Sequence, residues 1–96
     1  MKTEERLYGK ITANLPNEHE RTLAYYILDS DIKIEGATVR VYGLKAEEIE
    51  KNNKSTMKSI LDITSSREEI ERLAEKMLRG FVALHFFENV IEDYIA

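Results

Sequence analysis

Alternation of apolar and polar residues predicts that the first two-thirds of the chain forms β-strands. From Leu7 to Leu15 apolar residues occupy every second position, which is the period of a strand with one covered face. Gly9 weakens this strand, so we expect it at the edge of a sheet. The segment Thr22–Leu28 is rich in aromatic and branched residues and is apolar on both faces. This pattern favours a strand that is covered on both sides or lies inside the sheet.

Turn residues divide the strands that follow. Glu35-Gly36 predicts a two-residue hairpin loop, because glycine accepts positive φ, and Thr38–Leu44 is then the returning strand. Asp29-Ser30-Asp31 interrupts the apolar pattern before this loop. We interpret the interruption as a β-bulge, since Ile32-Lys33-Ile34 resumes the alternation at once.

The segment after the returning strand has two interpretations. Glu47–Lys54 is polar and predicts a hairpin tip. A short helix over Ala46–Lys51 is the competing interpretation, because Ala, Glu and Lys are good helix formers. Thr56–Ile63 predicts the last strand.

The last third of the chain predicts two helices separated by one glycine. Ser65 with Glu68, or Ser66 with Glu69, forms a capping box, in which a hydroxyl and a carboxylate satisfy two free backbone N–H groups. The helix over about 67–79 then has one apolar stripe that faces a sheet, made of Ile70, Leu73, Ala74, Met77 and Leu78. Gly80 stands where glycine commonly ends a helix.

The second predicted helix, about 84–95, is apolar over a wider arc. Its main stripe consists of Leu84, Phe87, Val90, Ile91, Tyr94 and Ile95. Phe86 lies roughly 100° from the centre of that stripe, given the turn of a helix per residue. A helix that covers one sheet face does not need Phe86. Either this helix lies deep between layers, or part of its surface faces a partner.

These elements predict an α+β fold. We expect an antiparallel meander of three to four strands over about 6–63, followed by two C-terminal helices, about 66–79 and 84–95, packed on one sheet face. A chain of 96 residues is long enough to bury a core of its own, so we expect a single domain spanning 1–96.

Composition narrows the class of protein. Hydrophobic residues make up 43% of the chain and charged residues 33%, which is typical of a soluble globular protein. Cysteine is absent, which excludes disulfides and thiolate chemistry. Four of the first six residues are charged and no long apolar run follows, so we expect a cytoplasmic protein without a membrane span. The formal net charge of −4 argues mildly against nucleic acid as a partner.

Four short motifs are distinctive: Tyr42-Gly43-Leu44, Asp62-Ile63-Thr64, His85 and Val90-Ile91-Glu92-Asp93-Tyr94. In these motifs the chain resembles a family of small uncharacterised bacterial proteins, a domain of unknown function common in clostridia and their relatives. The resemblance covers roughly residues 22–95. Where that family tends to have Ser-Pro before the second helix, Ala83-Leu84 stands here, which removes a helix cap. The resemblance implies no activity, so no catalytic or binding residue follows from it.

The candidate residues for chemistry are few. His85, Glu88 and Glu92 fall on one side of the second helix, a spacing at which imidazole and carboxylate can share a metal. They face away from the apolar stripe, and no second Glu-x-x-His completes a site, so we expect a solvated role and no metal or cofactor. His19 lies in a polar turn and is expected to be exposed.

An acid–base enzyme would need a carboxylate pair or a histidine held in a cleft. The acids closest to apolar strands are Asp29, Asp31 and Asp62. A bulge accounts for the first two and the approach to a helix N-terminus for the third. We therefore assign no catalytic residue, and a metal-dependent enzyme is the least favoured alternative.

A group of lysines gives the nucleic-acid alternative. Lys45, Lys51, Lys54 and Lys58 cluster around the third predicted hairpin and could contact phosphate. Glutamates stand between them and cancel much of their field, so a solvated loop that protects a sheet edge is the simpler interpretation.

Aromatic residues are numerous for so small a chain, and those left over from a core are typical of partner surfaces. We expect a partner-binding surface on the second helix, at His85, Phe86, Phe87 and Tyr94. The sequence thus favours a small non-catalytic protein-interaction or regulatory module, with a homodimer through the second helix or a strand edge as the sharper hypothesis.

Overall fold

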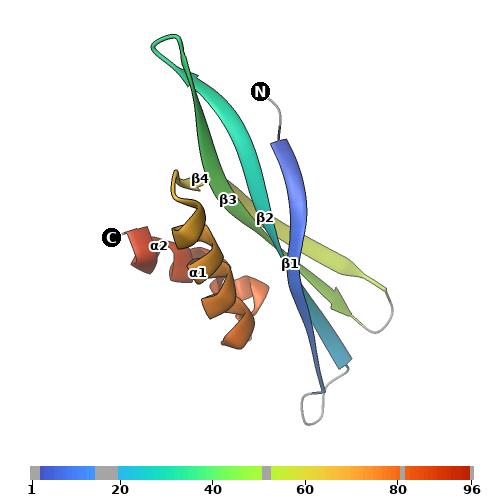
Figure 1. Ribbon diagram of the computed structural model, residues 1–96. Coiled ribbons are helices and arrows are strands. Elements are labelled where there is room, and N and C mark those ends of the chain that lie inside the picture. The colour runs from blue at the N-terminus through green and yellow to red at the C-terminus, as the bar shows by residue number, and fades with distance from the viewer. Residues whose placement is uncertain (1–2, 15–19, 51–52, 81, 96) are drawn as a thin grey trace.

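The protein folds as one four-stranded antiparallel sheet followed by two helices that lie against one of its faces (Figure 1). The structure, a computed structural model, describes residues 3–14, 20–50, 53–80 and 82–95. Its elements are β1 (Thr3–Asn14), β2 (Glu20–Ile34), β3 (Ala37–Glu50), β4 (Ser55–Thr64), α1 (Arg67–Arg79), the 3₁₀ turn η1 (Leu84–Phe86) and α2 (Phe87–Ile95). Each strand pairs with its neighbour in sequence, in the order β1-β2-β3-β4. The predicted α+β fold and its meander are confirmed, with β1 at an edge and β2 inside the sheet.

The central hairpin of β2 and β3 is regular along its whole length. Its pairing runs without a shift from Arg21 opposite Glu50 to Ile34 opposite Ala37. The turn at Glu35-Gly36 is confirmed, with φ of 51° and 83°, the positive values that a two-residue loop of type I′ requires. The apolar and polar residues of both strands therefore keep the same face throughout.

The bulge that the sequence predicts at Asp29-Ser30-Asp31 is wrong. These three residues continue strand β2, and each pairs with its partner on β3 without a shift of register. The Ser30 hydroxyl lies 3.0 Å from the Thr3 hydroxyl on β1, and Asp31 accepts a hydrogen bond of 3.2 Å from Arg40, its cross-strand partner. Polar cross-strand partners, which the sequence pattern does not reveal, keep the strand regular.

The short helix considered for Ala46–Lys51 is also wrong, because β3 continues to Glu50. Ala46 is fully buried beneath the helices, and the Glu47 carboxylate accepts a hydrogen bond of 3.1 Å from Tyr26. These contacts with distant segments override the local helix propensity. The predicted hairpin tip is correspondingly shorter, and residues 51–52 lie outside the described part of the chain.

Two irregularities occur where the sequence places a glycine. In β1 the pairing with β2 shifts between Leu7 and Gly9, and a Cβ on Gly9 would press on the side chain of Leu78 in α1. The pairing of β3 with β4 shifts around Gly43. There the backbone of β4 at Ile60 and Leu61 crosses so close to Gly43 that a side chain would collide with it. Glycine at position 43 therefore permits the close approach of two backbones.

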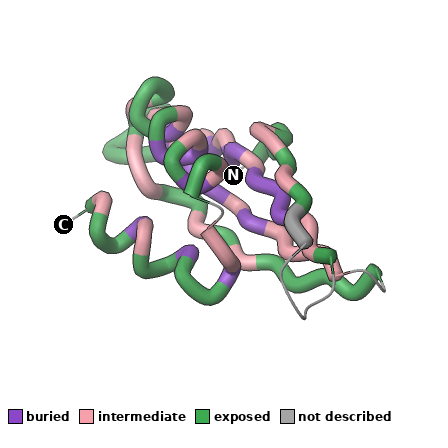
Figure 2. Tube along the Cα trace, turned by 90° about the horizontal axis from the view of Figure 1, so that it is seen from below, coloured by how far each residue is buried: buried purple, intermediate pink, exposed green. Residues whose placement is uncertain are grey.

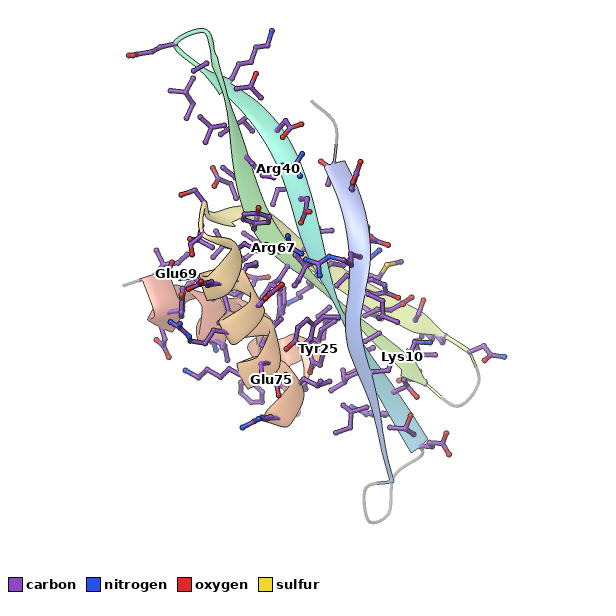
Figure 3. All side chains as sticks on the ribbon, viewed as in Figure 1. Lys10, Tyr25, Arg40, Arg67, Glu69 and Glu75 are labelled. Carbon is purple, nitrogen blue, oxygen red and sulfur yellow. The ribbon has the colours of Figure 1, made fainter. Side chains whose placement is uncertain are left out.

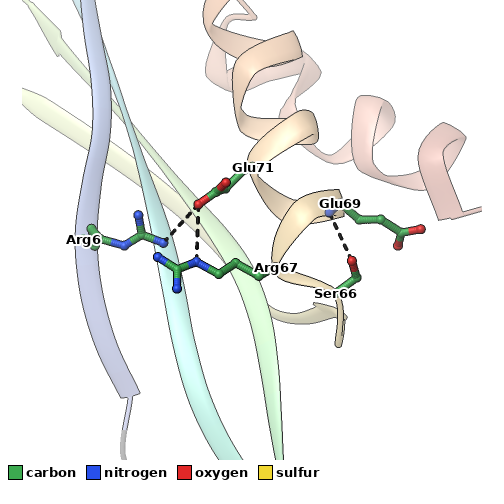
Figure 4. A network of polar contacts seen from close by, with 5 residues as sticks. All are labelled: Arg6, Ser66, Arg67, Glu69 and Glu71. Atoms are coloured by element: carbon green, nitrogen blue, oxygen red, sulfur yellow. Dashed lines mark hydrogen bonds and ion pairs between the residues drawn. The ribbon is translucent and has the colours of Figure 1, made fainter.

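Helix α1 begins and ends where the sequence predicts. The Ser66 hydroxyl accepts a hydrogen bond of 3.3 Å from the Glu69 N–H, so Ser66 is the N-cap (Figure 4). The reciprocal half of the capping box takes a different form. The Glu69 carboxylate accepts a hydrogen bond of 2.9 Å from the Thr64 hydroxyl, which in turn accepts one of 3.1 Å from the Ser66 N–H. Thr64 thus relays the contact between Glu69 and the cap.

The second helical segment is less regular. It begins as the 3₁₀ turn η1, and Ala83, the residue before it, makes no side-chain cap. Buried positions then recur along one side of the segment (Figure 2), namely Leu84, Phe87 and Ile91. Ile95, which the sequence pattern includes in the apolar stripe, is exposed. In the described part of the chain, no helix has the length and apolar character needed to cross a membrane.

The core fills the space between the sheet and the helices. Its centre consists of Leu23, Tyr25, Ile27, Leu44, Ala46, Ile70, Leu73, Ala74, Met77, Leu84, Phe87 and Ile91. The strand residues among them are the odd positions of β2 and the even positions of β3. The even positions of β2 and the odd positions of β3 consequently point away from the helices.

Candidate interaction surface

The sheet face opposite the helices is not covered by any described element (Figure 1). We call it the open face. In the four-stranded part of the sheet it carries Glu5 and Leu7 from β1, Tyr26 and Leu28 from β2, Val41, Lys45 and Glu47 from β3, and Met57, Ser59 and Leu61 from β4.

Apolar side chains on the open face are exposed to solvent. Leu7 is 48% exposed and Met57 53%, and Leu61 is exposed as well. Leu28 and Val41, at the middle of the two central strands, are buried, although they lie opposite the helices. Exposed apolar side chains on one face are a feature of sites where a protein contacts a partner.

A network of polar contacts crosses the centre of the open face. The Lys45 ammonium donates a hydrogen bond of 2.7 Å to the Glu5 carboxylate, so β3 is tied to β1 across the intervening strand β2. The same ammonium lies 5.0 Å from the centre of the Tyr26 ring, and the Tyr26 hydroxyl donates to Glu47. The hydrogen bond to Glu5 raises the pKa of Lys45, and burial followed by the bond to Glu47 raises the pKa of Tyr26. These polar groups are therefore satisfied within the chain.

A shallow depression of about 360 Å³ lies beside this network. It is lined by Thr3, Glu5, Leu28, Lys45, Met57, Lys58, Ser59 and Leu61. The depression is wide open to solvent, and apolar and polar side chains share its lining. Such a shape suits the projecting side chains of another protein better than it suits an enclosed small molecule.

The open face is close to neutral. Glu5, Glu20 and Glu47 stand on it against Lys10 and Lys45, whereas the whole chain has a formal net charge of −4. The acidic excess is thus carried mainly elsewhere, including the exposed sides of the helices. A neutral face can approach an identical face without strong repulsion.

The chain matches, over residues 4–96, the family described as "Family of unknown function (DUF6514)". The chain belongs to this family. The matched region begins closer to the N-terminus than the sequence resemblance, which covers roughly residues 22–95. Searches of curated proteins and of solved structures gave no match.

In this DUF6514 protein, the residues predicted to bind a partner on the second helix separate into two groups. Phe87 is fully buried and Tyr94 is half-buried against the core. His85 and Phe86 are exposed, and their rings meet edge to face with centres 5.0 Å apart. Of the four residues, His85 and Phe86 are therefore the ones that present a substantial surface. Their role in binding stays a prediction.

The residues considered for metal or acid–base chemistry do not gather into one site. Among the described residues, no group of three or more His, Asp or Glu side chains could hold a metal ion. Glu88 forms an ion pair of 3.4 Å with Lys58, and Asp31 is engaged by Arg40. One carboxylate oxygen of Asp29 is shielded from solvent without a hydrogen-bond partner in the described structure. His19 lies outside the described residues.

The lysines of the nucleic-acid alternative are also dispersed. Lys45 is on the open face and pairs with Glu5, whereas Lys58 is on the helix side and pairs with Glu88. Lys54 is exposed just before β4, and Lys51 lies outside the described residues. Lys45 and Lys58 both contribute to the lining of the depression, but each ammonium group is paired with a different carboxylate, so the two do not form a free cationic surface.

A second polar network joins β1 to the start of α1 (Figure 4). The carboxylate of Glu71 lies 3.9 Å from the Arg6 guanidinium and 3.5 Å from that of Arg67. All three side chains are substantially exposed, so each contact contributes at most about 1 kcal/mol. We assign this network to the packing of the helix against the edge strand.

Sequence reasoning missed the open face as a surface, although one signal pointed to it. Thr22–Leu28 is apolar on both faces, which indicates cover on both sides, yet the two predicted helices suffice for only one. The exposed residues Leu7, Met57 and Leu61 carry no such signal. Their exposure depends on where the helices dock.

Proposed function

We propose that this protein is a small non-catalytic interaction module that works as a homodimer, with the open face as the contact between the two copies. The observation that carries the proposal is a sheet face with exposed apolar residues that is nearly neutral on an acidic chain. A regulatory role in the cytoplasm of a bacterium, exerted through protein contacts by a single domain spanning 1–96, belongs to the same proposal. The sequence resemblance to bacterial proteins supports a bacterial origin of this chain.

The size of the open face agrees with what a stable dimer needs. Four strands spaced ~4.8 Å apart and about ten residues long present roughly 600 Å² of flat area, before the relief of the side chains is counted. Each partner in an interface of standard size buries about 800 Å². A sheet packed face to face on a second copy would reach this range.

The chemistry of the face suits an identical partner. Its charged groups at the centre, Glu5, Lys45 and Glu47, already have partners within the chain, so contact with a second copy leaves few charges to satisfy. The exposed apolar residues, Leu7, Met57 and Leu61, stand on both edge strands around that centre. Two such faces bury apolar surface against each other and release its ordered water.

The experiment is a measurement of mass by light scattering and sedimentation over a wide range of concentration. We expect the wild type to dimerise and Met57→Glu to shift the equilibrium towards monomer. Phe86→Glu is the matched control, since Phe86 is exposed to a similar degree, 54%, on the helix side. A wild-type monomer at every concentration would remove the proposal. A dimer that Phe86→Glu disrupts and Met57→Glu does not would place the contact on the second helix instead.

A further inference from the structure

The β2–β3 hairpin projects beyond the rest of the sheet (Figure 1). In the described structure, pairing with β1 ends at Ser30 and pairing with β4 ends at Tyr42. Asp31–Arg40 therefore forms a two-stranded ribbon, which we call the arm. It contributes to the elongated shape of the molecule, which measures 53 × 26 × 17 Å.

The arm has one apolar face and one polar face. The regular pairing sets Ile32 opposite Val39 and Ile34 opposite Ala37 on one face. On the other face Asp31 stands opposite Arg40, and Lys33 opposite Thr38. Because successive side chains alternate, the apolar face of the arm continues the open face of the sheet. Ile34 is 52% exposed.

Few interactions within the arm stabilise its own conformation. A two-stranded hairpin is marginally stable in water. Its turn places Glu35, a residue with a Cβ, at a positive φ of 51°, and its ion pair between Asp31 and Arg40 is exposed. An apolar face on so weak a support is stabilised when another surface covers it.

The second copy is the partner that the geometry provides. The arm extends past the helices of its own chain (Figure 3), and its apolar side faces the same way as the open face. A copy that packs on the open face consequently meets the arm too, and symmetry gives the same contact to the other arm. The arm adds roughly 100 Å² of flat area to the four-stranded face.

We propose that in the homodimer each arm lays its apolar face, Ile32, Ile34, Ala37 and Val39, on the partner copy. This inference rests on the proposed homodimer and adds to it the segment that holds the two copies together. The apolar face of the arm contacts the second copy, and its polar face stays in solvent.

Val39 and Thr38 allow a closely matched test. They are adjacent on β3, are both β-branched and similar in size, and point to opposite faces of the arm. We expect Val39→Asp to weaken dimerisation at least about tenfold, because it places a charge in the contact. Thr38→Asp, with the same change of charge, should alter it less than about twofold. Ile34→Asp should behave like Val39→Asp, and circular dichroism would verify that each variant folds.

Amide hydrogen exchange gives a second readout that needs no substitution. Exchange in residues 31–40 of the wild type should slow as the protein concentration rises through the dimerisation range. A wild-type dimer whose affinity Val39→Asp and Ile34→Asp leave unchanged, with exchange in the arm independent of concentration, would overturn the role of the arm and leave the homodimer standing. A wild type that never dimerises would overturn both.

Discussion

The hydroxyl of Tyr8 on the edge strand β1 donates a hydrogen bond of 2.6 Å to the carboxylate of Glu75 on α1. This contact joins residues far apart in the sequence and ties the first strand to the helix that covers it. The same carboxylate accepts a hydrogen bond of 2.8 Å from Arg79, one turn further along α1. The bond from Tyr8, followed by that from Arg79, lowers the pKa of Glu75.

Replacing Tyr8 by Phe should raise the pKa of Glu75 towards the ordinary value for glutamate. The contact stabilises the folded state above the unfolded pKa of Glu75 and loses its effect as the pH falls through the lowered folded pKa. An NMR titration of the Glu75 side chain in both proteins measures the change. An unchanged pKa in Tyr8→Phe would show that the hydrogen bond contributes nothing to Glu75.

Gly43→Ala should destabilise the protein by about 3 kcal/mol. A methyl group at this position would collide with the backbone of Ile60 and Leu61, which cannot move aside as a flexible side chain does. Gly36→Ala is the control, because nothing lies near its Cβ position and only its positive φ opposes alanine, at about 1 kcal/mol. Denaturation by urea measures both. Equal losses in the two variants would contradict the close crossing of β3 and β4.

Ser66→Ala should cost about 1 kcal/mol of stability, since it removes the acceptor for the Glu69 N–H at the start of α1. The neighbouring Ser65 is exposed and is not the N-cap, so Ser65→Ala should change stability by less than about 0.5 kcal/mol. Thermal and urea denaturation of the two variants distinguish the alternative capping boxes. A larger loss in Ser65→Ala would move the cap by one residue.

Phe87→Ala and Phe86→Ala should differ sharply in stability although the residues are adjacent. Phe87 is fully buried in the core, and its truncation should cost about 3–5 kcal/mol. Phe86 is more than half exposed, so its truncation should cost less than about 0.5 kcal/mol. Comparable losses would mean that Phe86 also packs in the core.

Alkaline pH should destabilise the protein partly through Tyr25. Its hydroxyl donates a hydrogen bond of 2.6 Å to the Val82 carbonyl, and burial, with a smaller contribution from Glu48, raises its pKa from 10.0 to about 12. Between these values the folded state keeps a proton that the unfolded state has lost, so this contribution to stability is complete below pH 10 and is lost as the pH rises towards 12.

Tyr25→Phe isolates this effect from that of other tyrosines. The free energy of unfolding of the variant should be about 1 kcal/mol lower at neutral pH, because the hydrogen bond to Val82 is removed. Above pH 10 its stability should fall less steeply than that of the wild type, by up to about 1.4 kcal/mol per pH unit. Urea denaturation at a series of alkaline pH values measures both slopes. Parallel curves would contradict the raised pKa.

Local signals account for the parts of the fold that the sequence predicts well. The bounds of α1 follow from its cap, its apolar period and Gly80, all of which act within a few residues. The hairpin at Glu35-Gly36 follows from turn chemistry in the same way. The strand ending at Glu50 was missed, because Ala46 is held by core packing that involves distant residues.

The site depends on distant contacts to a greater degree. The place where β4 crosses Gly43 and the ion pair of Glu5 with Lys45 each join segments that no sequence window contains. Phe87, expected at a partner surface, is buried because η1 and α2 turn it towards the sheet. The sequence shows that Thr22–Leu28 is apolar on both faces. It does not show which face stays open, because that depends on where the helices pack.

The order of the elements has a consequence for how the chain is made. All four strands precede both helices, and each strand pairs with the one before it. During synthesis the sheet emerges from the ribosome before the helices that close the core, so both of its faces are bare at first. Until the helices are made, the nascent chain exposes the apolar sheet face that they later cover, and exposed apolar surface of this kind makes a folding intermediate prone to aggregate.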